Sequence, residues 1–131
     1  MTLVVDASVA FNACAAEDGF ALLPDEDLRG PPLLWSETRS SLHEATWRGL
    51  WSAQAGELAH ARLAVVPIRR EEPRDLGKTA WEIAEQLGWA KTYDAEYVAL
   101  AQLLGCRLVT VDERLRRGAD RVVEVVPPAE L

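Results

Sequence analysis

The sequence predicts a three-layer α/β/α sandwich with a mostly parallel central sheet. Short apolar runs with the pattern of strands alternate along the chain with longer segments of helical spacing. Such alternation places parallel strands side by side and covers both faces of the sheet with helices. A length of 131 residues is enough for one domain with one core, and a hydrophobic share of 49% is normal for a globular protein. We therefore expect residues 1–131 to form a single domain of the α/β class.

The first predicted elements are a strand, a helix and a loop. Thr2–Val5 is apolar and β-branched and is predicted to be a buried strand, followed by a short helix from Ala7 to about Ala16. Pro24–Pro32 combines proline, glycine and charged residues, which break both helices and strands, and is predicted to be the one long loop. Pro32–Trp35 is predicted to be the second short strand.

Two helices and an edge strand are predicted next. Ser36 is expected to cap a helix that runs to about Trp51, and Ser52 a helix that runs to about Ala64. Val65–Ile68 is predicted to be a short strand. The proline inside this strand favours the edge of the sheet, because proline has no N–H to donate.

The C-terminal half continues the alternation. Helical spacing of apolar residues predicts a helix ending before Gly88, a residue suited to stop it. The apolar residues of this helix are Leu76, Ala80, Ile83, Ala84 and Leu87. Thr92 is expected to cap the next helix. The remaining predicted elements are that helix over Tyr93–Leu104, a strand over Arg107–Val111, a helical turn over Asp112–Arg117 and a last strand over Arg121–Val126.

Acidic residues lie at the ends of the predicted strands. Asp6 directly follows the first strand, and Asp112 follows the strand that ends in Leu-Val-Thr. Glu37 comes just past the second strand, and Asp94 lies in the first turn of the apolar helix after Thr92. Ligands of such sheets bind beyond the carboxyl ends of the strands, where the strand order reverses. We therefore expect the four acids to converge at one edge of the sheet.

Each acid taken alone has a structural alternative. Aspartate and glutamate are favoured at helix N-termini, where they accept hydrogen bonds from free N–H groups. Asp112 and Glu37 fit this role especially well, because each stands at the start of a predicted helix. Capping does not require, however, that the acids follow strands of one sheet. The joint pattern therefore favours a functional site.

Clustered carboxylates predict a divalent metal ion. They repel one another and raise each other's pKa unless a cation neutralises them. Oxygen ligands suit Mg²⁺ or Mn²⁺, whereas zinc prefers histidine and cysteine. The only histidines, His43 and His60, have no metal-ligand spacing and are interpreted as solvated or interface residues. One or two such ions would orient a water molecule, lower its pKa and stabilise charge on a phosphate.

The net charge of −7 argues at first against a nucleic-acid partner. Carboxylates that bind metal ions, however, add to the number of acidic residues but are neutralised by those ions. A catalyst also needs basic residues only locally, at the rim of its site. The basic residues after Asp112 are candidates for this rim, with a solvated helical turn as the alternative. These residues are Arg114, Arg116 and Arg117.

Features of the chain also predict its location. No basic segment or long apolar run precedes Asp6, so we predict no signal peptide. No apolar run of about 18 residues occurs, so we predict no membrane span. The expected location is the cytoplasm. Cys14 and Cys106 are accordingly expected to be free thiols rather than a disulfide.

Three segments resemble one known family. LVVDASV, WSETRSSLHEATWRG and TYDAEYVALAQLLGCRLVTVDERL, in this order over essentially the whole chain, resemble PIN domains and specifically the VapC-type toxins of bacterial toxin–antitoxin pairs. The resemblance implies a PIN-like fold and a Mg²⁺-dependent endoribonuclease, with Mn²⁺ as a substitute, that cleaves cellular RNA. It also implies a cognate antitoxin as partner and a homodimer.

The same resemblance implies roles for individual residues. The family's acidic metal-binding positions fall on Asp6, Glu37, Asp94 and Asp112. Glu37 depends most on this match, with Glu44 as its competitor. Ser8 and Thr110 match small hydroxyl positions that the family often has near the site. Ser40 departs from the family pattern, in which asparagine is common.

The helix predicted after Ser36 is apolar on two faces, and both must be buried. One face can contact the sheet, and the other can contact a partner helix or a second copy of the chain. The alternative is that the helix Ala53–Ala64 covers it. The two faces consist of His43, Trp47, Leu50 and Trp51, and of Leu42, Ala45 and Gly49.

Other α/β proteins with acids at strand ends fit less well. A haloacid-dehalogenase-like phosphatase needs a second aspartate two residues after the first, where Ser8 stands. A phosphoacceptor receiver domain needs a lysine after a late strand, and the only lysines are Lys78 and Lys91. A nucleotide-binding domain needs a glycine-rich phosphate loop, which is missing. A PIN-like nuclease of RNA processing outside a toxin–antitoxin pair remains an alternative, whereas a non-enzymatic PIN-like module predicts lost acids.

Overall fold

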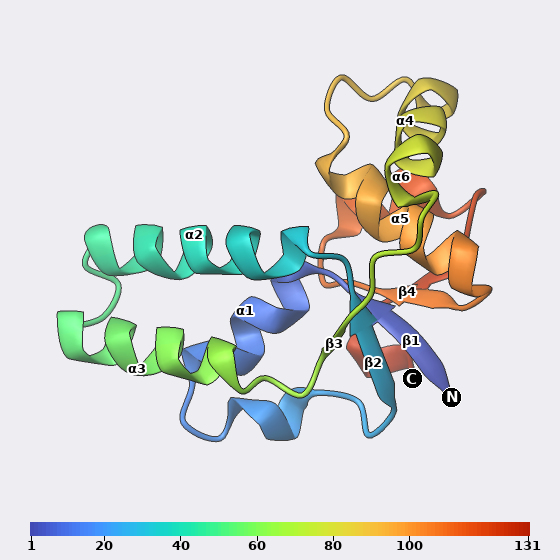
Figure 1. Cartoon of the computed structure of the whole chain (residues 1–131). Helices are drawn as coiled ribbons and strands as arrows, with labels where there is room; N and C mark the ends of the chain where they lie inside the picture. Colours follow the sequence, from blue (N-terminus) through green and yellow to red (C-terminus); the bar gives the residue numbers. More distant parts are fainter.

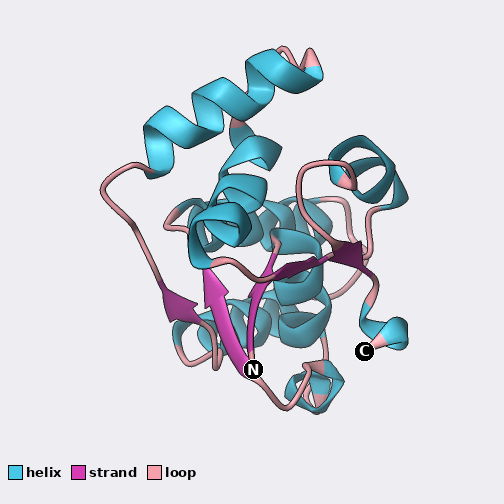
Figure 2. Ribbon diagram, turned by 90° about the vertical axis from the view of Figure 1, so that its right-hand side faces the viewer, coloured by secondary structure: helices cyan, strands magenta, loops and turns pink.

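The computed structural model describes residues 1–131 and contains one five-stranded sheet with the order β3-β2-β1-β4-β5. All four strand pairings are parallel, which confirms the predicted sheet. Figure 2 shows the strands fanning out as one twisted sheet. The strands are β1 (Thr2–Val5), β2 (Asp27–Gly30), β3 (Arg69–Arg70), β4 (Arg107–Val109) and β5 (Val125–Val126).

Helices cover both sides of the sheet. α1, α2 and α3 pack against one another on one side, and α4, α5 and α6 lie on the other (Figure 1). Two short 3-10 helices, at Gly19–Leu22 and Pro128–Glu130, complete the chain. The predicted three-layer α/β/α sandwich is therefore confirmed. The helices are α1 (Ala7–Ala15), α2 (Leu33–Trp47), α3 (Ala53–Ala64), α4 (Leu76–Leu87), α5 (Tyr93–Leu104) and α6 (Glu113–Ala119).

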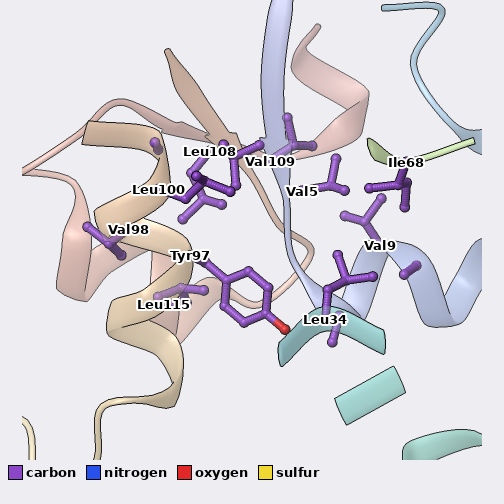
Figure 3. Packing of buried hydrophobic residues seen from close by; sticks show 14 of the residues in the cluster. Val5, Val9, Leu34, Ile68, Tyr97, Val98, Leu100, Leu108, Val109 and Leu115 are labelled. Carbon is purple, nitrogen blue, oxygen red and sulfur yellow. The ribbon is translucent and has the colours of Figure 1, made fainter. Parts of the chain in front are cut away.

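The core is built around β1 and α5. The residues of β1 from Leu3 to Val5 are fully buried, because β1 has a strand on each side. α5 packs against β1 and β4, and its residues from Tyr97 to Ala101 are buried. Figure 3 shows Tyr97 and Leu100 of α5 on one side of the strand residues Leu108 and Val109. A helix this apolar is stable only inside the protein.

The strand order reverses between β1 and β4. β1 continues through α1 to β2 on one side, whereas β4 continues through α6 to β5 on the other side. Side chains that follow these two strands therefore meet in the crevice where ligands bind in such sheets. Asp6 follows β1, and Thr110 follows β4.

The predictions for residues 24–35 are wrong. The second strand is Asp27–Gly30, inside the predicted loop, and Leu33 already begins α2. The sequence of β2 has no apolar pattern, and its buried residues are Leu28 and Gly30. Arg29 forms ion pairs with Asp27 and with Glu71. Pairing with β1 on one side and β3 on the other stabilises this strand, although its sequence lacks a strand pattern.

Two further boundaries on this side differ from the predictions. α2 begins before Ser36, whose hydroxyl donates to the Leu33 carbonyl instead of capping a helix. α2 ends at Trp47 rather than Trp51, because the chain turns at Gly49 with a φ of 77°. β3 covers Arg69–Arg70, just beyond the predicted strand, and it does lie at the edge of the sheet.

The remaining predicted elements are confirmed with small shifts. Ser52 caps α3, since its hydroxyl accepts a hydrogen bond from the Ala55 N–H at 3.1 Å. α4 ends at the left-handed Gly88, as predicted. α5 has the predicted bounds, but Thr92 makes no side-chain capping bond. β4 and β5 are shorter than predicted, and α6 is longer than the predicted turn.

Both cysteines are free thiols, as predicted: Cys14 is buried and Cys106 half-buried. None of the helices has the length and apolar character that crossing a bilayer requires.

Candidate active site

Asp6 is fixed at the end of β1 by several hydrogen bonds. Its carboxylate is almost entirely buried, with 5% of the residue exposed. One oxygen caps α1 by accepting from the N–H groups of Ser8 at 3.1 Å and Val9 at 3.3 Å. The same oxygen accepts from the Ser8 hydroxyl, and the other accepts from the Thr110 hydroxyl. Asp6 is therefore both a helix cap and a rigid side chain at the predicted edge.

Ser8 and Thr110 connect the ends of β1 and β4. Their hydroxyl oxygens are 3.3 Å apart. Ser8 Oγ also accepts from the Val111 N–H at 3.2 Å, and Thr110 Oγ1 accepts from the Asp112 N–H at 3.0 Å. These small hydroxyls hold the chain after β4 against the start of α1, as their predicted position near the site requires.

Asp112 caps α6. One of its oxygens accepts from the Arg114 N–H at 2.9 Å and from the Leu115 N–H at 3.4 Å. The capping alternative considered for the sequence thus holds for Asp112 and for Asp6. It does not compete with a site, because both carboxylates also line the pocket described below.

Asp94 has no such structural partner. It lies in the first turn of α5, caps no helix, and makes no hydrogen bond or close ion pair. Burial and the charge of Asp112 raise the pKa of Asp94, while Arg114 opposes this rise. Its place in the first turn favours a negative charge, but no hydrogen bond within the chain fixes the Asp94 carboxylate.

The Glu37 carboxylate is positioned by Tyr97, a residue that was not identified from the sequence as part of the site. The Tyr97 hydroxyl donates to Glu37 Oε1 at 2.6 Å. Tyr97 is 1% exposed, and Figure 3 shows its hydroxyl pointing away from α5 toward α2 near Leu34. The signal was available, since Tyr97 stands three residues after Asp94 and so on the same side of one helix.

The structure brings the predicted acids to one pocket. This acidic pocket has a volume of about 510 Å³ and opens between α1, α2, α5 and the end of β4. Glu44 also lines it, but its carboxylate forms an ion pair with Arg48 at 2.8 Å. Glu37 makes no ion pair and is the better candidate of the two. The predicted acids in the lining are Asp6, Glu37, Asp94 and Asp112.

The carboxylates of the pocket interact electrostatically. Burial raises the pKa of Asp6, although hydrogen bonds from Ser8 and Thr110 oppose this. Burial also raises the pKa of Glu37, and the charges of Asp94 and Asp6 add to the rise. Burial, together with the neighbouring charges, thus disfavours the ionised carboxylates, and a cation between them would stabilise their ionised form.

The donor set fits a hard divalent cation. No three of the His, Cys, Asp and Glu side chains already lie close enough together to hold a metal ion as a cage. Mg²⁺ does not need such a cage, because it usually keeps several water molecules and is bound through one or two carboxylates. The unpartnered carboxylate of Asp94 and the pKa shifts of its neighbours fit this kind of site.

The predicted basic residues are only partly brought to this site. Arg114 is exposed and has Asp112 as its nearest carboxylate, with Nε 3.9 Å from Oδ1. Arg116 is ion-paired with Glu113 and Glu130, and Arg117 is exposed outside the pocket lining. Of the three arginines proposed as a rim, only Arg114 lines a pocket that also contains Asp94 and Asp112.

Other singled-out residues lie apart from the acids. His43 and His60 are exposed, and His60 Nε2 accepts from Arg39 Nε at 3.1 Å. Ser40 is exposed outside the acidic pocket. α3 does not cover the second face of α2, because Trp47 is 81% exposed. Trp51, by contrast, stacks on Phe11 at 5.9 Å.

Known proteins share both the sequence and the fold. The family model described as PIN domain matches residues 3–121. Over 115 residues the chain is 39% identical to ribonuclease VapC9 of Mycobacterium tuberculosis, covering 86% of this chain and 87% of the relative. The structure of PAE2754 from Pyrobaculum aerophilum is similar with a TM-score of 0.75 and 25% identity, over 99% of this chain and 94% of that one. A toxin–antitoxin complex from Klebsiella pneumoniae contains a chain of the same fold, with a TM-score of 0.66 and 15% identity, over 96% of this chain and 97% of that one.

Proposed function

Because the chain belongs to the PIN-domain family, with a VapC ribonuclease among its relatives, we propose that it is a Mg²⁺-dependent endoribonuclease that cuts cellular RNA as the toxin of a toxin–antitoxin pair. One observation of the structure supports this most. Acids that are far apart in the sequence, from Asp6 to Asp112, line one pocket at the carboxyl ends of parallel strands. The negative charge of this pocket favours the binding of a cation, and a bound cation attracts a phosphate group.

The proposed metal-binding residues are the four acids of the pocket, which would hold one or two ions, each through one or two carboxylates and water. Mg²⁺, or Mn²⁺ in its place, would activate a water molecule and stabilise charge on the phosphate that is cut. Asp6 is held rigidly by its hydrogen bonds, and Tyr97 holds Glu37 through one oxygen. The other Glu37 oxygen and the carboxylate of Asp94 have no partner within the chain and are free to bind. The ligands are Asp6, Glu37, Asp94 and Asp112.

The proposed partners are RNA, a cognate antitoxin and a second copy of the chain, all in the cytoplasm. A shared fold with a chain of a toxin–antitoxin complex agrees with an antitoxin. Trp47 at the end of α2 and Leu50 in the turn after it are both exposed and offer a surface on which a homodimer can form.

Substitution of the acids tests the nuclease activity. Wild-type protein freed of any antitoxin is expected to cut RNA with Mg²⁺ or Mn²⁺ and to stop when EDTA is added. Asp6→Asn and Asp94→Asn are expected to lower the rate by roughly 100-fold or more, because each removes a metal-binding charge at nearly constant volume. Cleavage is measured on labelled RNA by gel electrophoresis.

Glu44→Gln is the matched control, because Glu44 lines the same pocket but is ion-paired. It should retain most of the activity. Wild-type rates in both aspartate variants would refute the site. The toxin role is tested separately by expression in bacteria: growth should stop and be rescued by a partner encoded next to the gene. Cleavage without growth arrest would favour a nuclease of RNA processing instead.

A further inference from the structure

A second pocket adjoins the acidic pocket. It has a volume of about 510 Å³ and opens between the turn after α4, the start of α5, and α6. It shares Glu37, Asp94 and Asp112 with the acidic pocket, so the two meet at the proposed metal site. Its volume is within the range of pockets that hold small ligands. We call it the side pocket.

The side pocket contains two available cations, Lys91 and Arg114. Lys91 is exposed and forms no ion pair or hydrogen bond within the chain. The Arg114 side chain is 88% exposed and 3.9 Å from its nearest carboxylate. Arg48, the cation of the acidic pocket, is by contrast paired with Glu44 at 2.8 Å. The cations of the side pocket can therefore bind an anion without breaking a close ion pair.

An exposed aromatic ring lies beside these cations. Tyr93, the first residue of α5, is 55% exposed, and its hydroxyl makes no hydrogen bond within the chain. Packing of the core does not explain this ring, because the residues of α5 that pack against the sheet begin at Ala95. A planar ring next to flexible cations is the combination with which proteins bind unpaired nucleotides.

We propose that the side pocket binds one nucleotide of an unpaired RNA segment next to the phosphate that is cut, with the base stacked on Tyr93 and a phosphate on Lys91 and Arg114. The inference rests on the proposed nuclease function, since it takes the acidic pocket as the place of cleavage. In duplex RNA the bases stay stacked on one another and cannot reach a protein ring. A single-stranded segment or a loop presents such an unstacked base, and the side pocket supplies the local basic rim of this acidic protein.

Binding is tested in the Asp6→Asn background, with Mg²⁺ present. Asp6 lies outside the side pocket, so this substitution stops cleavage without changing the lining of that pocket. The probe is a short fluorescein-labelled single-stranded RNA, followed by fluorescence anisotropy over a range of salt concentrations. Tyr93→Ala should weaken binding at least about fivefold, and Tyr93→Phe should retain it. Lys91→Ala should lower the slope of log affinity against log salt by about 0.7, and Lys91→Arg should preserve it.

Lys78→Ala is the matched control, because Lys78 is exposed and lies outside the acidic and side pockets. It should bind RNA like the parent protein. Unchanged binding in Tyr93→Ala, equal losses in Lys78→Ala and Lys91→Ala, or equal affinity for a duplex RNA would overturn the proposal. If these binding results are as expected but the wild-type protein cuts no RNA, RNA binding by the side pocket is supported and the proposed nuclease function is refuted.

Discussion

At the scale of single residues, the bond between Tyr97 and Glu37 joins the core to the proposed metal site. Tyr97 is buried among core residues of α5, and its hydroxyl reaches Glu37 on α2. Burial and the bond to Glu37 raise the pKa of Tyr97, so its hydroxyl keeps its proton and remains the donor. A neighbour that orients a metal-binding carboxylate typically affects metal affinity strongly.

Tyr97→Phe tests this role with little change in core packing. We expect it to lower the affinity for Mn²⁺ roughly 10-fold or more, because Glu37 is no longer held. The free energy of unfolding should fall by about 1–3 kcal/mol, the range for a hydrogen bond to a charged group. Mn²⁺ binding is measured by calorimetry and stability by urea unfolding. Tyr93→Phe is the control, since its exposed hydroxyl has no partner; an unchanged Mn²⁺ affinity in Tyr97→Phe would contradict the role.

At this scale most of the site was predicted from the sequence, whereas Tyr97 was missed despite its helical spacing from Asp94. Asp6 and Asp112 directly follow strands with clear apolar patterns, and Asp94 opens a strongly apolar helix. Tyr97 stands in that same apolar pattern and therefore looked like an ordinary core residue. Its function depends on a contact with α2, which is 60 positions away in the sequence.

At the scale of elements, close packing of α2 against α3 fixes the helix that presents Glu37. A Cβ atom at Gly56 of α3 would overlap the whole side chain of Thr46. Thr46 cannot move away easily, because its hydroxyl donates to the Leu42 carbonyl at 2.8 Å and accepts from the Trp51 indole at 2.7 Å. Glycine is therefore required at this crossing.

Gly56→Ala is expected to destabilise the protein although alanine favours helices. The added methyl group should force the two helices apart and lower the free energy of unfolding by about 1–3 kcal/mol. Gly77→Ala is the control, since Gly77 lies in α4 with open space around it. That substitution should stabilise the protein by about 0.5–1 kcal/mol. Urea unfolding checks both, and a stabilised Gly56→Ala variant would refute the packing argument.

Elements were predictable where the local pattern agreed with the fold. α3, α4 and α5 have helical spacing or end signals, and the structure confirms them. β2 was missed because its charged residues and neighbouring prolines read as a loop. What makes Asp27–Gly30 a strand is its place between β1 and β3, and this long-range pairing is invisible to local patterns.

At the scale of the whole molecule, the acidic pocket makes stability depend on pH. The pKa of Asp94 is raised above its ordinary value of 3.8, so the folded protein holds this proton more tightly than the unfolded chain. Ionisation of Asp94 therefore destabilises the metal-free fold. This destabilisation is absent below the pKa of the unfolded chain and is complete once the pH has risen through the folded-state pKa.

Asp94→Asn should consequently raise the midpoint of thermal unfolding in the presence of EDTA at neutral pH. The gain over wild type should shrink as the pH falls toward about 4, where the wild-type carboxyl is also neutral. The measurement is a series of thermal melts across this pH range. Asp25→Asn, in the exposed loop before β2, is the control for the loss of one negative charge outside the acidic pocket. A variant less stable than wild type at every pH would contradict the proposed cost of ionising Asp94.

The central position of β1 has a consequence for the order in which the protein assembles during synthesis. β1 is made first, yet it pairs with β4, which begins more than 100 positions later at Arg107. β1 and β2 can pair early, but the Thr110 hydroxyl binds Asp6, and Asp112 joins the pocket lining, only after β4 has left the ribosome. A nascent chain that ends before β4 thus contains no complete acidic pocket. The ribosome therefore produces most of this proposed ribonuclease before the chain is able to cut any RNA.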